Sequence, residues 1–210
     1  MGVAIIWWCG YAERWHWARG EKDNAHMITV YKICNDVDRY QSLRTDDSWV
    51  RKIKDDGRPL KRLWKAPPKT YAPNPKLNVP DFWAFDPLLS GFVVSLALYE
   101  SIPLLGKLGE ALPLDVVDHE SDDLVYYSLK NIVDCLDKEK SKWDPEINWI
   151  DKFVFKARLL KGPLFKIPQH ITSEMYVVEG LLPPEKEFRA IVESRHLTGI
   201  DFKKVWRGKK

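Results

Sequence analysis

The sequence has few of the residues from which metal, redox and phosphate sites are built. Its 210 residues include three cysteines, Cys9, Cys34 and Cys135, and none belongs to a C-x-x-C pair. This excludes a zinc ribbon and a thioredoxin-like redox motif. The eleven glycines form neither G-x-G-x-x-G nor G-x-x-x-x-G-K-[ST], so the common phosphate-binding loops are absent. Scattered thiols are typical of a reducing compartment, and we expect a cytoplasmic protein without a cofactor.

Long apolar runs are also missing. No stretch approaches the roughly 18 apolar residues that a membrane-spanning helix needs. The apolar segment at residues 3–9 is short, follows no basic residue and precedes no small-residue cleavage site, so it is a poor signal peptide. We therefore expect no membrane partner.

The charge is nearly balanced, but its distribution is uneven. The formal net charge is +3, and five basic residues fall within the last eight positions. They are Lys203, Lys204, Arg207, Lys209 and Lys210. Nucleic-acid binding usually requires a basic face, whereas a short basic end on a slightly acidic body is typical of a solvated tail. We favour the tail, and keep a nucleic-acid-binding accessory protein as an alternative.

The composition changes along the chain and predicts four parts. Residues 1–26 hold four tryptophans without a clear period, and we interpret them as an upstream extension, with Met27 as the natural start. Residues 27–65 are rich in short strand and turn patterns. Five prolines at 66–80 predict an extended connector. Residues 81–210 form the main region.

Local patterns predict a mixture of strands and short helices. Asp86-Pro87 resembles a helix start, and apolar residues then recur at helical spacing as far as Tyr99. Pro183-Pro184 opens a second helix that Gly199 ends. Strands are predicted at 28–33, 124–137 (where the centre could also be helical), 153–158 in a hairpin with 164–168, 175–178 and 200–206. Helices separate from antiparallel strands indicate the α+β class: antiparallel-rich sheets with a few packed helices.

An acidic cluster offers the one candidate for a catalytic pocket. It consists of Asp118, His119, Glu120, Asp122 and Asp123. Carboxylates and a histidine can bind a metal, but the EF-hand register and its glycine are missing. We favour a solvated or partner-facing loop, and keep as an alternative an enzyme with a pocket here. No residue is assigned as catalytic or as a metal ligand.

A second acidic run is mixed with lysines. Asp134, Asp137, Glu139 and Asp144 alternate with Lys138, Lys140 and Lys142, a pattern typical of an exposed face with ion pairs. No two of the five histidines lie at a metal-ligand spacing, and we interpret His170 as a turn residue with satisfied hydrogen bonds.

Several segments together resemble one family. They are I-T-V-Y-K-I at 28–33, L-P-L at 112–114, N-I-V-D-C-L-D-K-E-K-S at 131–141, L-F-K-I at 164–167, Ser173-Glu174, and H-L-T-G-I-D-F at 196–202. From about Met27 onward the chain resembles the immunity protein 11 family of bacterial polymorphic-toxin systems. The resemblance implies an antitoxin that binds a cognate effector, delivered for example by type VI secretion. It implies no catalytic activity and no cofactor.

A neutralising protein needs aromatic anchors and a charged rim. Trp143 and Trp149 flank the turn at Asp144-Pro145 and are candidate anchors. The other candidates for partner binding are Asp118, Glu120, Asp122, Asp123, Asp137, Glu139 and Ser141. Asp137 and Ser141 could instead cap a turn or a helix.

Overall fold

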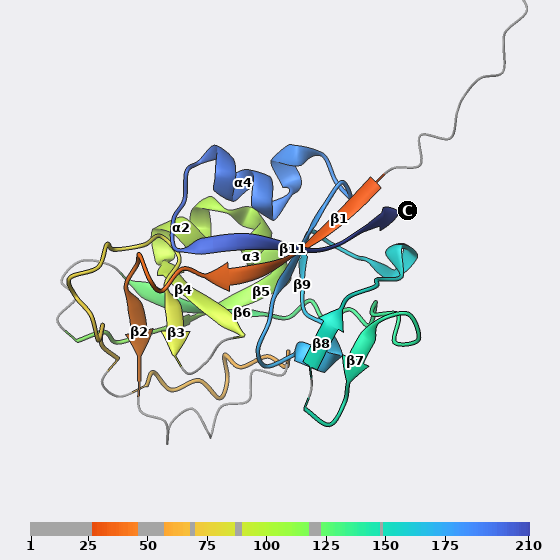
Figure 1. The fold of residues 1–210 in the computed structure, drawn as a ribbon. Coiled ribbons are helices and arrows are strands. Elements are labelled where there is room, and N and C mark those ends of the chain that lie inside the picture. The colour runs from red at the N-terminus through yellow and green to blue at the C-terminus, as the bar shows by residue number, and fades with distance from the viewer. Residues whose placement is uncertain (1–26, 46–56, 68–69, 87–89, 118–122, 148) are drawn as a thin grey trace, which may run out of the picture.

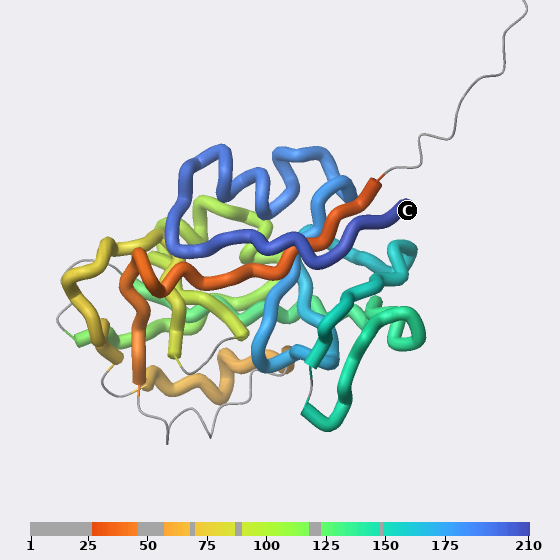
Figure 2. The backbone as a smooth tube through the Cα atoms, in the orientation of Figure 1, coloured from red at the N-terminus to blue at the C-terminus, as the bar shows by residue number. Residues whose placement is uncertain are grey.

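The fold follows from a computed structural model, shown in Figures 1 and 2. The structure describes residues 27–45, 57–67, 70–86, 90–117, 123–147 and 149–210. Most strand pairs in these ranges are antiparallel, and the short helices pack against the sheets. The predicted α+β class is therefore confirmed. The predicted extension at 1–26 lies outside the described residues.

A four-stranded antiparallel sheet, which we call the central sheet, joins the two ends of the described chain. Its strand order is β11-β1-β10-β9. The strands are β1 (Met27–Asn35), β9 (Leu164–Phe165), β10 (Tyr176–Glu179) and β11 (Ile200–Lys209). The long strands β1 and β11 lie side by side (Figure 1). The strands predicted at 28–33, 175–178 and 200–206 are confirmed, and β11 is longer than predicted.

The basic residues at this end are exposed, as predicted, but they belong to a paired strand and not to a free tail. Of the five basic residues, only Lys210 lies outside β11, which pairs with β1 along its length. The strand is held because Val205 and Trp206 pack against a buried cluster on one face of the central sheet. Val30 pairs with Trp206 and Tyr31 with Lys204, so Val205 is an extra residue in a β-bulge.

A three-stranded sheet packs beside the central sheet. It has the order β4-β6-β5, with β4 (Gly91–Ser95), β5 (Gly109–Pro113) and β6 (Leu124–Leu129). Every residue of β6 is buried. The strand predicted at 124–137 is confirmed only as far as Leu129, and residues 130–137 form neither a helix nor a strand. Helices α2 (Leu96–Ser101), α3 (Pro103–Leu108) and α4 (Phe188–Ser194) complete the main core, which includes Phe92, Tyr127 and Val177.

The helix predicted from Asp86-Pro87 to Tyr99 is wrong over most of its length. Phe92 and Val93 lie in β4, and the helix begins at Leu96. Residues 91–94 are buried on both faces of the strand. Because the apolar run is unbroken, its hydrophobic pattern does not distinguish a strand from a helix. The Ser95 hydroxyl accepts a hydrogen bond from Leu98 N at 3.1 Å and caps α2.

The remaining elements cover the outer faces of the two sheets. Strands β2 (Ser42–Arg44) and β3 (Ala84–Asp86) pair in parallel and pack against the three-stranded sheet. Strands β7 (Lys142–Asp144) and β8 (Trp149–Lys152) form an antiparallel pair beside the central sheet. Three short 3₁₀ turns, Ala157–Leu159, Pro168–His170 and Pro184–Lys186, connect the elements in this half of the chain.

The hairpin predicted between 153–158 and 164–168 is also wrong. β8 ends before this segment, and β9 pairs with β10. Phe153 and Phe155 are stacked with their ring centroids 5.8 Å apart, and both pack against the same cluster. The alternating pattern predicts the burial correctly, since Phe155 is buried and Lys156 and Arg158 are exposed, but the segment packs without a strand ladder.

Gly199 fixes the entry into β11. Its φ of +95° lies in the left-handed region, and an added Cβ would overlap the Phe82 carbonyl oxygen. The preceding residue, Thr198, donates from its backbone N to Asp81 Oδ2 at 2.8 Å, and Phe82 N donates to the Thr198 carbonyl at 3.0 Å. The start of β11 is thus tied to the segment that leads into β3.

We predict that Gly199→Ala lowers the free energy of unfolding by about 2 kcal/mol or more, because the substitution combines strain with a backbone overlap. Gly106→Ala is the matched control: it lies within α3, and its Cβ would be 3.5 Å from the Tyr99 hydroxyl. There we expect no loss, or a gain of up to about 1 kcal/mol. Chemical denaturation measures both, and equal effects would contradict this account of the turn.

Candidate functional site

A groove of about 520 Å³ opens between β8 and β11. Its walls come from β8 and from the bulged part of β11, and its floor comes from β1 and the segment after the 3₁₀ turn at Pro168–His170. We call it the lysine groove. Its lining residues are Lys32, Trp149, Ile150, Asp151, Lys152, Phe153, His170, Ser173, Glu174, Lys203, Lys204 and Val205.

Positive charge exceeds negative charge in this groove. Lys32 is paired with Glu174, with Nζ and Oε1 2.7 Å apart. For Lys152, Lys203 and Lys204, no carboxylate lies within ion-pair distance in the described part of the chain. Uncompensated ammonium groups in a concave surface attract anions.

The pairing of β1 and β11 places two of these lysines opposite each other. Lys32 is the direct partner of Lys203 in the antiparallel register, and like charges in this relation destabilise a sheet. Lys203 and Lys204 both line the groove. Lys204 pairs with Tyr31 and also lines a second cavity with Tyr31 and Glu179 on the α4 side of the sheet, so it borders both faces. The backbone geometry therefore concentrates positive charge here.

A polar cluster forms the floor of the groove. The Glu174 carboxylate accepts hydrogen bonds from Lys32 and from the Tyr176 hydroxyl, and His170 Nδ1 lies 2.7 Å from Glu174 Oε2. Burial raises the pKa of Glu174, but the hydrogen bonds from His170, Lys32 and Tyr176 outweigh burial and bring that pKa down to about 2. Burial also raises the pKa of Tyr176.

The hydrogen bonds of the cluster fix its side chains in position, and they make Glu174 a poor candidate for a general base. A carboxylate with a pKa near 2 is a weak proton acceptor at neutral pH. His170 is buried within its 3₁₀ turn and bonded, so its interpretation as a satisfied turn residue is confirmed. Sequence reasoning missed its partner, although His170 and Glu174 stand at the i, i+4 spacing of side chains on one turn.

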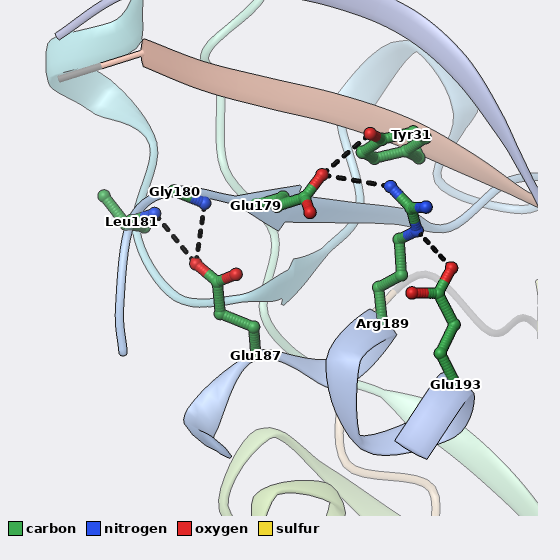
Figure 3. A network of polar contacts seen from close by, with 7 residues as sticks. All are labelled: Tyr31, Glu179, Gly180, Leu181, Glu187, Arg189 and Glu193. Atoms are coloured by element: carbon green, nitrogen blue, oxygen red, sulfur yellow. Dashed lines mark hydrogen bonds and ion pairs between the residues drawn. The ribbon is translucent and has the colours of Figure 1, made fainter. Parts of the chain in front are cut away.

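A second polar network anchors α4 on the opposite face of the central sheet (Figure 3). Glu179 Oε2 accepts hydrogen bonds from the Tyr31 hydroxyl at 2.7 Å and from Arg189 Nη1 at 3.0 Å. Arg189 also donates from Nε to Glu193 at 2.8 Å, and its guanidinium carbon lies 4.1 Å from the centroid of the Tyr31 ring. Burial and the bond to Glu179 raise the pKa of Tyr31.

The residue before α4 completes this anchoring. The buried Glu187 carboxylate accepts hydrogen bonds from the backbone N–H groups of Gly180, Leu181 and Leu182 at 2.7, 2.9 and 3.1 Å (the first two drawn in Figure 3). The end of β10 is thereby fixed to the start of α4. These contacts thus tie α4 to β1 and to the end of β10.

Most of the partner-binding residues predicted from the sequence do not line the groove. Asp118, Glu120 and Asp122 lie outside the described residues, and Asp123 is exposed just before β6. Glu139 is exposed on the turn at 138–140. Among the predicted residues that the structure describes, Trp149 alone reaches the groove.

Asp137 and Ser141 organise a turn, as their alternative interpretation proposed. The Ser141 hydroxyl accepts a hydrogen bond from Val154 N at 3.0 Å and donates one to the Val154 carbonyl at 3.2 Å. Asp137 is buried, its carboxylate accepts a hydrogen bond from Lys140 N at 3.4 Å, and its carbonyl accepts one from Ser141 N at 2.8 Å. Both residues therefore have local structural partners.

The two candidate tryptophans differ in exposure. Trp143 is half-buried against the cluster below the central sheet, with Lys138 Nζ 5.4 Å from its ring. Trp149 is 61% exposed on the wall of the groove. Trp149 is consequently the better candidate anchor for a partner.

Other kinds of site are not seen in the described part of the chain. No three His, Cys, Asp or Glu side chains in these ranges gather where they could hold a metal ion. None of the helices described here has both the length and the apolar character needed to cross a membrane. Cys135 is a packed side chain, and its burial raises the pKa of the thiol to about 12. The thiol is therefore a poor nucleophile.

The comparisons with known proteins give no family and no relative. No protein-family model matches the chain, and no curated protein is detectably similar to it. The resemblance to the immunity protein 11 family stays a prediction.

We predict that Glu174→Gln flattens the acid branch of the stability curve. The carboxyl has a lower pKa in the folded protein, about 2, than in the unfolded chain, where it is about 4.3. Its contribution is therefore complete above pH ~4.3 and is lost as the pH falls from there through ~2. The wild type should lose about 3 kcal/mol more than the variant between pH ~5 and ~2.

Denaturation at a series of pH values measures this difference. Glu139→Gln, which removes an exposed carboxylate from the turn at 138–140, serves as the control and should follow the wild-type curve. Parallel curves for the wild type and Glu174→Gln would show that the cluster does not hold an ionised carboxylate.

Proposed function

We propose that this protein is a cytoplasmic immunity protein that neutralises a cognate bacterial toxin by protein–protein contact. The sequence resemblance supplies the class of partner. The structure contributes a surface whose composition suits binding: a groove that combines an exposed indole with ammonium groups that have no carboxylate partner among the described residues. Aromatic anchors beside complementary charges are typical of tight interfaces.

The exposed side chain of Trp149 carries the proposal. A tryptophan that is 61% exposed leaves a large apolar surface in contact with water. It lies at the start of β8, whose neighbour Ile150 is buried and anchors the strand. A tryptophan side chain has only two rotatable bonds, so it loses little conformational entropy when a partner covers it.

A catalytic function fits the groove less well. His170 and Glu174 lie together on the floor, as an acid–base pair would. However, Glu174 already accepts three hydrogen bonds, and its pKa of about 2 is far from neutral. These properties suit a group that positions Lys32 better than one that transfers protons.

The test uses the product of the adjacent gene, expressed alone and together with this protein. The proposal predicts that co-expression restores growth and that the two proteins purify as one complex. Growth arrest that persists in the presence of this protein, without a complex, would overturn the proposed function.

In that complex we predict that Trp149→Ala weakens binding by about 2 kcal/mol or more, since a buried aromatic anchor is lost. Tyr71→Ala is the control, because Tyr71 is an exposed aromatic residue beside β2 and does not line the groove. Calorimetric titration measures both variants, and thermal unfolding checks that they fold. Equal affinities of the two variants for the toxin would show that Trp149 is not part of the interface.

A further inference from the structure

We propose that the lysine groove binds a carboxylate-rich segment of the partner protein. This inference rests on the proposed function and names the chemistry of the partner. The toxin would present aspartate or glutamate side chains to Lys152, Lys203 and Lys204, and would cover Trp149 with an apolar group.

The balance of charge inside the groove supports an anionic occupant. Two carboxylates are among the described residues that line the groove, and each forms an ion pair with a lysine. Glu174 pairs with Lys32 at 2.7 Å, and Asp151 pairs with Lys142 at 2.6 Å. The three other lysines have no carboxylate within ion-pair distance among the described residues. An incoming carboxylate therefore meets ammonium groups without displacing an internal partner.

The arrangement of the walls suits side chains of alternating character. Lys203 and Lys204 line the groove from β11, and Lys152 lines it from β8. Trp149 and Val205 add apolar surface to the same lining. A segment with acidic residues on either side of an apolar one would satisfy both kinds of contact at once.

A nucleic acid fits the same surface less well. Its backbone carries one negative charge per nucleotide, and the groove would set Asp151 and Glu174 against that regular series. The lining cations are lysines, whereas planar, bidentate recognition of phosphate favours arginine. Separate carboxylates on a protein can be placed to avoid Asp151 and Glu174.

A charge-reversal pair tests the inference in the complex with the toxin. Lys203→Glu combined with Lys204→Glu should weaken binding at least ~100-fold and reduce its dependence on salt, because two attractions become repulsions. The neutral pair Lys203→Gln and Lys204→Gln should weaken it about tenfold. The control, Lys161→Glu with Lys186→Glu, makes the same change of net charge at exposed positions outside the groove and should bind like the wild type.

The two proposals can fail separately in this experiment. If Lys203→Glu combined with Lys204→Glu binds the toxin as the wild type does, the groove is not the docking site, but the immunity function stands. If wild-type protein binds no product of the adjacent gene, the immunity function fails. In that case the preference of the groove for carboxylates is tested without the toxin. Fluorescence anisotropy compares the binding of two labelled probes of equal net charge, a poly-glutamate peptide and an oligo-dT strand.

Tighter binding of the peptide, lost in Lys203→Glu with Lys204→Glu and kept in the control pair, supports the groove as a site for carboxylates. Tighter binding of the oligo-dT strand, or equal peptide binding by all variants, overturns it.

Discussion

The pairing of β1 with β11 is the constraint on which the rest of the structure depends. It joins residues 27–35 to residues 200–209 in an antiparallel pairing that one β-bulge interrupts. The same register separates the side chains of β1 into two sets, with Ile33 in the main core and Val30 in the cluster on the other face. It also places Lys32 opposite Lys203, so one set of backbone hydrogen bonds defines both the core and the charge of the groove.

Each face of the central sheet is completed by a buried or half-buried carboxylate. On the groove side Glu174 collects hydrogen bonds from three side chains, and on the α4 side Glu187 collects them from three backbone N–H groups. A carboxylate withdrawn from water is stable only when such donors replace its hydration. The Glu174 contacts connect Lys32 of β1, the turn at His170 and Tyr176 of β10 beside the groove, and the Glu187 contacts connect the end of β10 to α4.

The sequence predicts the parts of the fold in which one face of an element is buried and its ends are marked. The strands that begin near Met27 and Ile200 have β-branched or aromatic residues and clear boundaries, and both are confirmed. Prediction fails at 91–94, where burial on both faces removes the period, and at 153–158, where two aromatic rings pack without a ladder. For the groove, sequence reasoning found Trp149 but not its lysines. Lys32 and Lys203 come together only through pairing of the two ends of the described chain, and the bulge at Val205 has no local signal.

The central claim is that this protein acts through the surface between β8 and β11. Hydrogen–deuterium exchange of the free protein and of its complex with the adjacent gene's product tests it directly, because exchange reports which backbone amides a partner covers. The account predicts that added protection concentrates at residues 149–153 and 203–205. Protection confined to α2, α3 or the three-stranded sheet, with the groove unchanged, would contradict it.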